Sequence, residues 1–157
     1  MQTFLPFQSF EQSARSIDKK RCWKQVVEAK QILCVLRYDG VPQNWKESKG
    51  WIKQGWRNHP AVLMWKGYEN ALASYYNEFL DHCIKFHLIN TSMESLTLVD
   101  RPTYPWWLGD ENFHRAMRAR LIVKDRNFYL SKFPNDEGFN NGMYWWPDMK
   151  TRTFKTI

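Results

Sequence analysis

An apolar stripe over residues 61–86 constrains the fold of this chain more than any other feature of its sequence. The stripe has the spacing of one helix face and comprises Ala61, Trp65, Tyr68, Leu72, Tyr75, Phe79, Cys83 and Phe86. Pro60 suits the first turn of a helix, where its missing N–H costs nothing, and Asn58 is placed to cap that helix. We therefore predict one helix from residue 60 to about residue 87, roughly 40 Å long, as the spine of a small domain.

The start of this predicted helix carries groups suited to binding an anion. Arg57, Asn58 and His59 lie directly before Pro60. A helix N-terminus attracts anions because its free N–H groups and its dipole favour negative charge. These three residues are therefore candidates for contact with a phosphate.

A second helix is predicted over residues 18–37. Its apolar stripe, with steps of four, three, four and three residues, comprises Cys22, Val26, Ala29, Leu33 and Leu36. On one shoulder of that stripe Arg21, Gln25 and Glu28 fall within about 60° of each other. A carboxylate at the edge of a buried face can stabilise a developing cation or shuttle a proton. The alternative is an ordinary surface ion pair of Glu28 with Lys24 or Arg21.

A third helix is predicted to begin at Asp110, a capping residue, with Glu111 favourable in its first turn. Its polar positions carry His114, Arg115, Arg118, Arg120 and Lys124. Solvated surface is the ordinary role of such residues, and phosphate contact is the functional alternative. Residues 39–57 and 89–109 are rich in Gly, Pro and Trp, which is typical of loops. We predict an all-α fold over residues 1–157: a compact single-domain bundle of three main helices with long aromatic-rich loops.

Charge and aromatic content favour a nucleic-acid partner. The formal net charge is +7 for 157 residues, and 17% of the residues are Phe, Trp or Tyr, including nine Trp. A basic chain without an amphipathic anchor favours nucleic acid over membrane, and surplus aromatic rings suit stacking on bases. We expect double-stranded DNA as the partner, a monomer, and no membrane association.

The cysteines and the missing motifs indicate the compartment and the chemistry. Cys22, Cys34 and Cys83 are odd in number and form no CxxC pair, so we expect buried reduced thiols. No signal peptide, membrane span, phosphate-binding loop or metal-ligand spacing is recognisable. We therefore expect a cytoplasmic protein of a bacterium or a phage-infected cell, with no metal and no cofactor.

Three separated motifs resemble those of a known family. The first comprises Met1-Gln2-Thr3-Phe4-Leu5-Pro6, Ile17-Asp18-Lys19-Lys20-Arg21 and Lys24-Gln25-Val26-Val27-Glu28. The second is Gly55-Trp56-Arg57-Asn58-His59-Pro60-Ala61-Val62. The third is Trp107-Leu108-Gly109-Asp110-Glu111-Asn112-Phe113-His114-Arg115, with Lys124-Asp125 and a later Tyr-x-Trp-Pro run, Tyr144-Trp145-Trp146-Pro147. Together they resemble the pyrimidine-dimer DNA glycosylase family, in its bacterial and phage branch, over nearly the whole chain.

This resemblance implies both a fold and a mechanism. The fold has three main helices, with the N-terminus inserted beside the active site. The N-terminal amine, here that of Met1, attacks C1′ of the damaged nucleotide, and the resulting imine permits β-elimination of the 3′ phosphate. The assisting glutamate corresponds to Glu28, and the histidine that opens the central helix corresponds to His59.

The resemblance also implies DNA contacts through arginines near the glutamate and on the third helix. The expected nucleic-acid-binding residues are Arg21, Lys24, Gln25, Arg57, Asn58, His114, Arg115 and Arg118. We thus expect a DNA glycosylase, with or without abasic-site lyase activity, that excises a damaged or modified pyrimidine from duplex DNA. Val26 replaces an arginine that is usual in this branch, and Gln2 is too bulky for removal of Met1. Two alternatives follow: an inactive DNA-binding protein on the same fold, or a glycosylase for a phage-specific modified base.

Overall fold

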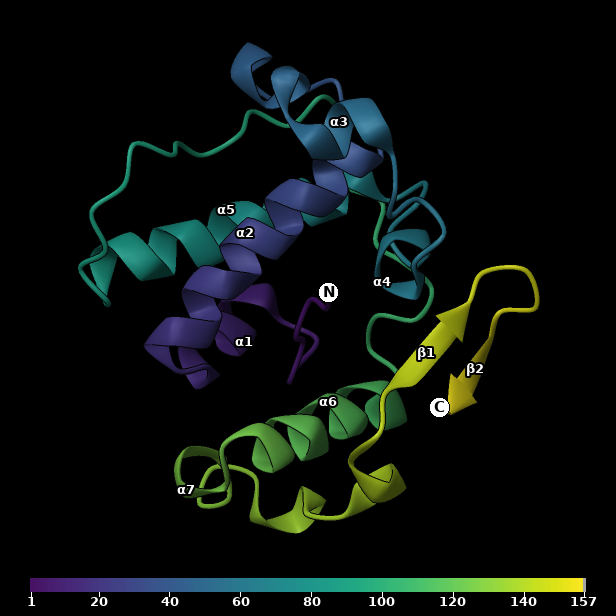
Figure 1. Ribbon diagram of the computed structural model, residues 1–157. Helices are drawn as coiled ribbons and strands as arrows, with labels where there is room; N and C mark the ends of the chain where they lie inside the picture. Colours follow the sequence, from purple (N-terminus) through teal and green to yellow (C-terminus); the bar gives the residue numbers. More distant parts are fainter. Residues whose placement is uncertain (157) are drawn as a thin grey trace. The chain divides into compact units, whose positions relative to one another are not determined.

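The computed structural model describes residues 1–156 and is mainly helical (Figure 1). The three longest helices are α2 (Lys19–Val35), α5 (Glu69–Lys85) and α6 (Glu111–Lys124). The shorter elements are α1 (Phe10–Ser16), α3 (Lys49–Lys53), α4 (Pro60–Leu63), α7 (Arg126–Tyr129), the 3-10 turns η1 (Gln43–Glu47), η2 (Pro134–Asp136) and η3 (Phe139–Gly142), and the strands β1 (Trp145–Asp148) and β2 (Thr153–Thr156). The predicted all-α class with three main helices is confirmed.

The chain forms two compact units. Unit 1 contains Met1–Thr3 and Lys19–Pro105, and unit 2 contains Phe4–Asp18 and the chain from Trp106 onward. The chain therefore begins in unit 1, passes through unit 2, returns to unit 1 at Lys19 and enters unit 2 again at Trp106. Every helix within residues 1–156 is too short or too polar to span a bilayer.

Unit 1 is built on the packing of α2 against α5 (Figure 1). The predicted stripe of α2 is buried over Cys22, Val26, Ala29 and Leu33. The facing side of α5 is equally buried, because its apolar residues also recur at helical spacing. All three cysteines are buried thiols, as predicted, and the sulfurs of Cys22 and Cys83 lie 3.2 Å apart between the two helices.

The predicted spine helix is wrong in one respect, because it is two helices and not one. Helix α4 ends at Leu63, and α5 begins only at Glu69. Gly67 between them has φ +88°, a left-handed conformation that glycine adopts readily. Its N–H donates to Glu69 Oε1 at 3.0 Å, so a local side-chain contact takes the place of a helical turn. Phe86, the last member of the stripe, lies beyond α5 and is exposed.

Unit 2 is organised around α6, which packs against α7, η2, η3 and β1. Asp110 caps α6 as predicted, accepting a hydrogen bond from the Phe113 N–H at 3.0 Å. The strands form an antiparallel hairpin in which Trp145 pairs with Thr156 and Asp148 with Thr153. This small sheet was not predicted, and it occupies the aromatic segment that follows the last helical element.

Candidate active site

The first three residues of the chain are held in the interior of unit 1. Gln2 is only 6% exposed and Thr3 is fully buried. The Trp65 indole N–H donates to Thr3 Oγ1 at 3.0 Å, and Trp65 is itself fully buried. The Thr3 N–H donates to Gln2 Oε1 at 2.8 Å. These contacts fix the chain on the carboxyl side of Met1, so the N-terminal amine has a defined position.

Glu28 projects from α2 into this region. It is 8% exposed, and its Oε2 has no hydrogen-bond partner among residues 1–156. Burial raises the pKa of Glu28, and the positive charges of the N-terminal amine and of Lys24 act in the opposite direction. A buried carboxyl group with an unpaired oxygen is costly to maintain, and such groups concentrate at functional sites.

His59 is the second residue on which the charge of the N-terminal amine acts. It is the N-cap of α4, and its Nδ1 accepts a hydrogen bond from the Ala61 N–H at 3.0 Å. The predicted cap, Asn58, is therefore wrong. Burial lowers the pKa of His59, and the charge of the N-terminal amine lowers it further. A neutral ring that accepts at Nδ1 carries its proton at Nε2.

The three residues predicted as catalytic are thus brought together in unit 1. The charge of the Met1 amine acts on both Glu28 and His59. One cation, one buried carboxyl group and one neutral imidazole therefore share a site. Their catalytic roles stay predictions, although this set has the groups needed for nucleophilic attack and proton transfer.

Gln25 and Tyr75 extend the site into the core. Gln25 is buried, and its Oε1 accepts a hydrogen bond from the Tyr75 hydroxyl at 3.2 Å. Burial raises the pKa of the Tyr75 hydroxyl well above its ordinary value, and the nearby Cys22 and Glu28 raise it further. Contact of Gln25 with DNA would require it to leave this buried position. In the sequence, Tyr75 is one member of an apolar stripe. The spacing of that stripe does not distinguish a tyrosine near a carboxyl group from an ordinary core tyrosine.

The remaining candidates in unit 1 lie toward the solvent. Lys24, Arg57 and Asn58 are exposed, and Arg21 is half-buried. Arg57 donates to the Gln54 carbonyl at 3.1 Å, which still leaves most of its guanidinium edge accessible to an anion. These side chains are accessible to a phosphate, and DNA contact through them stays a prediction.

Trp56 is an additional surface group beside the site. Its side chain is 53% exposed, and its ring meets that of His59 edge-on with centroids 5.6 Å apart. The exposed indole is accessible for stacking on another flat ring. The sequence showed this residue inside a motif without assigning it a role.

The α6 candidates require correction, because two of the three are interior residues of unit 2. His114 is buried, with Nδ1 donating to the Leu5 carbonyl at 2.8 Å and Nε2 accepting from the Gly109 N–H at 2.9 Å. Burial is the main cause that lowers the pKa of His114. Both ring nitrogens are occupied by backbone groups, so the ring anchors the N-terminal segment of unit 2 instead of facing DNA.

Arg118 has a similar internal role. Its guanidinium donates to Asp136 Oδ2 at 2.8 Å, to Glu111 Oε1 at 2.6 Å and to the Pro6 carbonyl at 2.7 Å. Contact with a phosphate would require these bonds to break. The prediction of DNA contact through Arg118 and His114 therefore conflicts with their burial.

Arg115 is the α6 candidate that reaches the surface. Its side chain is 41% exposed. It donates to Asp136 Oδ1 at 3.1 Å and to the Asn135 carbonyl at 3.0 Å, and it lies over the Phe139 ring. Arg115 is therefore held in place on the surface of unit 2, where phosphate contact stays a prediction.

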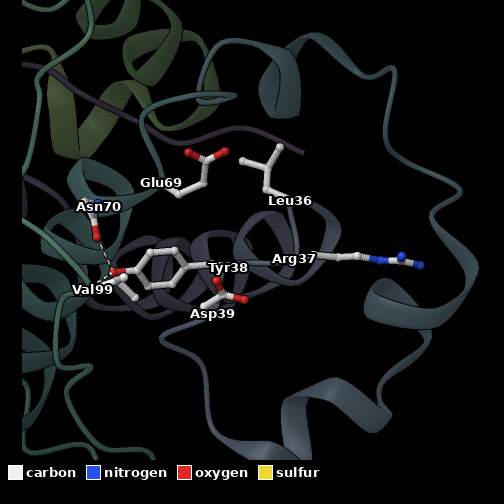
Figure 2. Close-up of a pocket in the computed structure, with 7 residues that line it drawn as sticks. All are labelled: Leu36, Arg37, Tyr38, Asp39, Glu69, Asn70 and Val99. Atoms are coloured by element: carbon white, nitrogen blue, oxygen red, sulfur yellow. Dashed lines mark hydrogen bonds between the residues drawn. The ribbon is translucent and has the colours of Figure 1, made fainter.

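A pocket of about 250 Å³ lies elsewhere in unit 1, beyond the end of α2 (Figure 2). Its lining consists of Leu36, Arg37, Tyr38, Asp39, Glu69, Asn70 and Val99. Figure 2 shows the Tyr38 hydroxyl directed toward Asn70 and Val99, and Arg37 pointing away from them. The hydroxyl donates to Asn70 Oδ1 at 2.5 Å and accepts from the Val99 N–H at 2.9 Å. These bonds tie the segment around residue 99 to α5, and none of the catalytic candidates lines this pocket.

Comparison with known proteins gives one match. Residues 1–85 match a protein family described as pyrimidine dimer DNA glycosylase. The matched segment includes Met1, Glu28 and His59, and it ends at the last residue of α5. Neither the curated proteins nor the solved structures that were searched gave a match.

Proposed function

Because this chain belongs to the pyrimidine dimer DNA glycosylase family, we propose that it excises a damaged or modified pyrimidine from duplex DNA and then cleaves the strand. The family supports glycosylase function in general and DNA as the substrate. The finer proposal rests on one observation: the Met1 amine acts electrostatically on both Glu28 and His59.

The first step is attack of the neutral Met1 amine on C1′ of the damaged nucleotide. A bond forms between the amine nitrogen and C1′, the glycosidic bond breaks, and the base leaves with the bonding electrons and takes up the proton that the nitrogen loses. The C1′–O4′ bond then breaks to open the sugar, O4′ takes up a proton from solvent, and the nitrogen lone pair completes the protonated imine at C1′. Free α-amino groups lose their proton near about pH 8 and lysine side chains above about pH 10. An N-terminal amine is therefore the better nucleophile of these two classes at neutral pH.

Glu28 supports this step through its charge. The sugar carries positive charge at C1′ as the base departs, and glycoside cleavage generally uses a carboxylate to stabilise it. Because burial raises the pKa of Glu28, the group is also suited to accept a proton. In the second step it takes a proton from C2′ of the imine, and the C3′–O bond breaks with departure of the 3′ phosphate.

His59 contributes by remaining neutral. A protonated imidazole beside the amine would oppose the amine's own positive charge, and both causes of its lowered pKa favour the uncharged ring. Its bond to the Ala61 N–H fixes the ring at the start of α4. His59 therefore provides a polar, uncharged ring close to the nucleophile.

DNA binding is attributed to the groups around this site that reach the solvent. Arg21, Lys24 and Arg57 contact backbone phosphates, which position a duplex without reading its sequence. The reacting nucleotide turns out of the stack, at a cost of a few kcal/mol. Trp56, exposed beside His59, stacks on a base at the vacated position, a contact worth about 1–3 kcal/mol.

The test uses two duplexes, one containing an abasic site and one containing a thymine dimer. Intact-protein mass is measured first, to establish which residue carries the N-terminal amine. Borohydride added to the reaction should reduce the imine to a stable protein–DNA link on both duplexes, and peptide mapping should place that link at Met1. Lys24→Arg is the matched control, since it keeps the charge and removes the lysine amine; its trapping should equal that of the wild type.

Three outcomes would contradict the proposal. A link that maps to Lys24, or that disappears in Lys24→Arg, would identify a different nucleophile. Binding of both duplexes without trapping, cutting or base release would leave the inactive DNA-binding protein as the function. Release of the base without a trapped link would instead indicate water as the nucleophile.

A further inference from the structure

Gln2 carries a buried hydrogen-bond donor that the protein does not use. Its side chain is 6% exposed, and its Oε1 accepts the Thr3 N–H at 2.8 Å. This bond fixes the orientation of the amide, because the oxygen faces Thr3 and the Nε2 group faces the other way. Nε2 has no hydrogen-bond partner among residues 1–156.

An unpaired buried donor is rare because it loses its bonds to water without replacement. Each such group in a native protein calls for a partner that the chain itself does not supply. The position of Gln2 indicates which partner this is. Gln2 directly follows Met1, whose amine acts on Glu28 and His59, and the Oε2 of Glu28 is also buried without a partner. One site therefore holds an unpaired donor and an unpaired acceptor.

We propose that the Gln2 amide binds the reacting nucleotide, donating a hydrogen bond from Nε2 to one of its oxygen atoms. This inference rests on the proposed function, since the nucleotide is at Met1 only if the amine attacks C1′. An amine in bonding distance of C1′ brings residue 2 close to that nucleotide, because adjacent Cα atoms are about 3.8 Å apart. The oxygens nearest to C1′ are O2 of the pyrimidine and O4′ of the sugar.

The two acceptors have different consequences. A bond to O2 stabilises the negative charge that develops on the departing pyrimidine, so it accelerates base release. A bond to the sugar or its phosphate positions C1′ and acts on every nucleotide, including an abasic one. The shared chemistry is an acceptor oxygen on the extruded nucleotide, and the two duplexes used below distinguish its source.

The experiment compares wild-type protein with Gln2→Met and Gln2→Glu. Methionine has a similar length and no donor. Glutamate keeps an oxygen for the Thr3 N–H and also lacks the donor. Neither residue is small, so Met1 is retained in both, which intact mass verifies. Thermal unfolding identifies any variant that is not folded, and Gln2→Glu preserves the internal bond if Gln2→Met does not fold.

Base release is measured on a thymine-dimer duplex, and borohydride trapping on an abasic-site duplex. About a tenfold loss of base release with unchanged trapping would place the contact at O2 of the pyrimidine. About a tenfold loss on both duplexes would place it at the sugar or phosphate. Both results support the inference. Binding of each variant to each duplex is measured in parallel, and affinity should fall for the duplex on which activity is lost.

Two results would overturn the inference. Folded variants that match an active wild type on both duplexes would show that the donor is satisfied by water alone. A wild-type protein that neither binds nor cuts either duplex would overturn the proposed function, and the role of Gln2 with it. Because the second result appears in the wild type and the first only in the variants, the two failures are distinguishable.

Discussion

Replacing Glu28 by glutamine should stabilise the protein at neutral pH and stop base release. Burial is the main cause that raises the pKa of Glu28 above its ordinary value of 4.5. The folded protein therefore holds this proton more tightly than the unfolded chain. Between the unfolded and the folded pKa the folded state binds more protons, so stability falls as pH rises through that window. Glutamine does not titrate and should not show this loss.

The size of the effect follows from the environment of the carboxyl group. Each unit of difference between folded and unfolded pKa is worth about 1.4 kcal/mol, and the N-terminal amine and Lys24 offset part of it. Glutamine still places a polar atom at the buried position of Glu28 Oε2, so the substitution removes only the cost of burying the charge. We expect a gain on the order of 1 kcal/mol at neutral pH for Glu28→Gln, which raises Tm by about 2–4 °C for a chain of this size.

The measurement is denaturant unfolding of both proteins from about pH 4 to about pH 7. The gain should be smallest at the acid end and grow with pH. Glu47→Gln is the matched control, because Glu47 is exposed; its stability should stay within about 0.5 kcal/mol of the wild type throughout. A Glu28→Gln protein less stable than wild type at neutral pH would show that attraction to the amine outweighs burial. Full base release by that variant would remove Glu28 from the mechanism.

Three further predictions concern binding, packing and protonation. Affinity for duplex DNA should fall with salt, with a log–log slope of about −0.9 for each phosphate neutralised, and a flat dependence would exclude a phosphate-led interface. Asp136→Ala should cost about 3 kcal/mol in denaturant unfolding because it removes a partner of the buried Arg118; a cost under about 1 kcal/mol would show that the remaining contacts suffice. Because the pKa of His59 is lowered, its capping bond is fully formed above its ordinary pKa and is lost as pH falls through the lowered value. His59→Asn, a cap that does not titrate there, should remove this part of the pH dependence, and an unchanged pH profile would contradict the assignment.

Periodicity predicted which faces are buried, because burial depends on the direction of a side chain more than on helix continuity. The prediction of the buried stripe of α2 was correct for this reason. The cap of α6 was predicted correctly because a cap depends only on residues next to the helix start. The break at Gly67 was not predictable from the stripe, since the residues on both sides of it keep the same buried face. The hairpin was missed because strands of four residues are too short for alternation to distinguish them from a loop.

The candidate site was predictable only through the motifs. Nothing in the apolar pattern separates Glu28 from other helical glutamates, and its environment depends on the chain terminus. The Thr3–Trp65 bond that fixes this terminus joins residues 62 positions apart. The burial of Arg118 depends on Asp136 and on the Pro6 carbonyl, which lie 18 and 112 positions away in the sequence. A charged residue on a helix is normally solvated, so the sequence favoured a surface role for Arg118.

The anchoring of Gln2 and Thr3 makes the proposed site sensitive to modification of the Met1 amine. Retention of a formyl group, N-terminal acetylation or an added affinity tag would each convert the amine into a neutral amide. The amine lowers the pKa of both Glu28 and His59, so its loss should raise both values and remove the proposed nucleophile at once. Since Gln2 and Thr3 are buried, residues added before Met1 would also have to run past the site to reach the solvent. The proposed mechanism therefore requires a free amine at Met1, and recombinant protein carries its affinity tag best away from Met1.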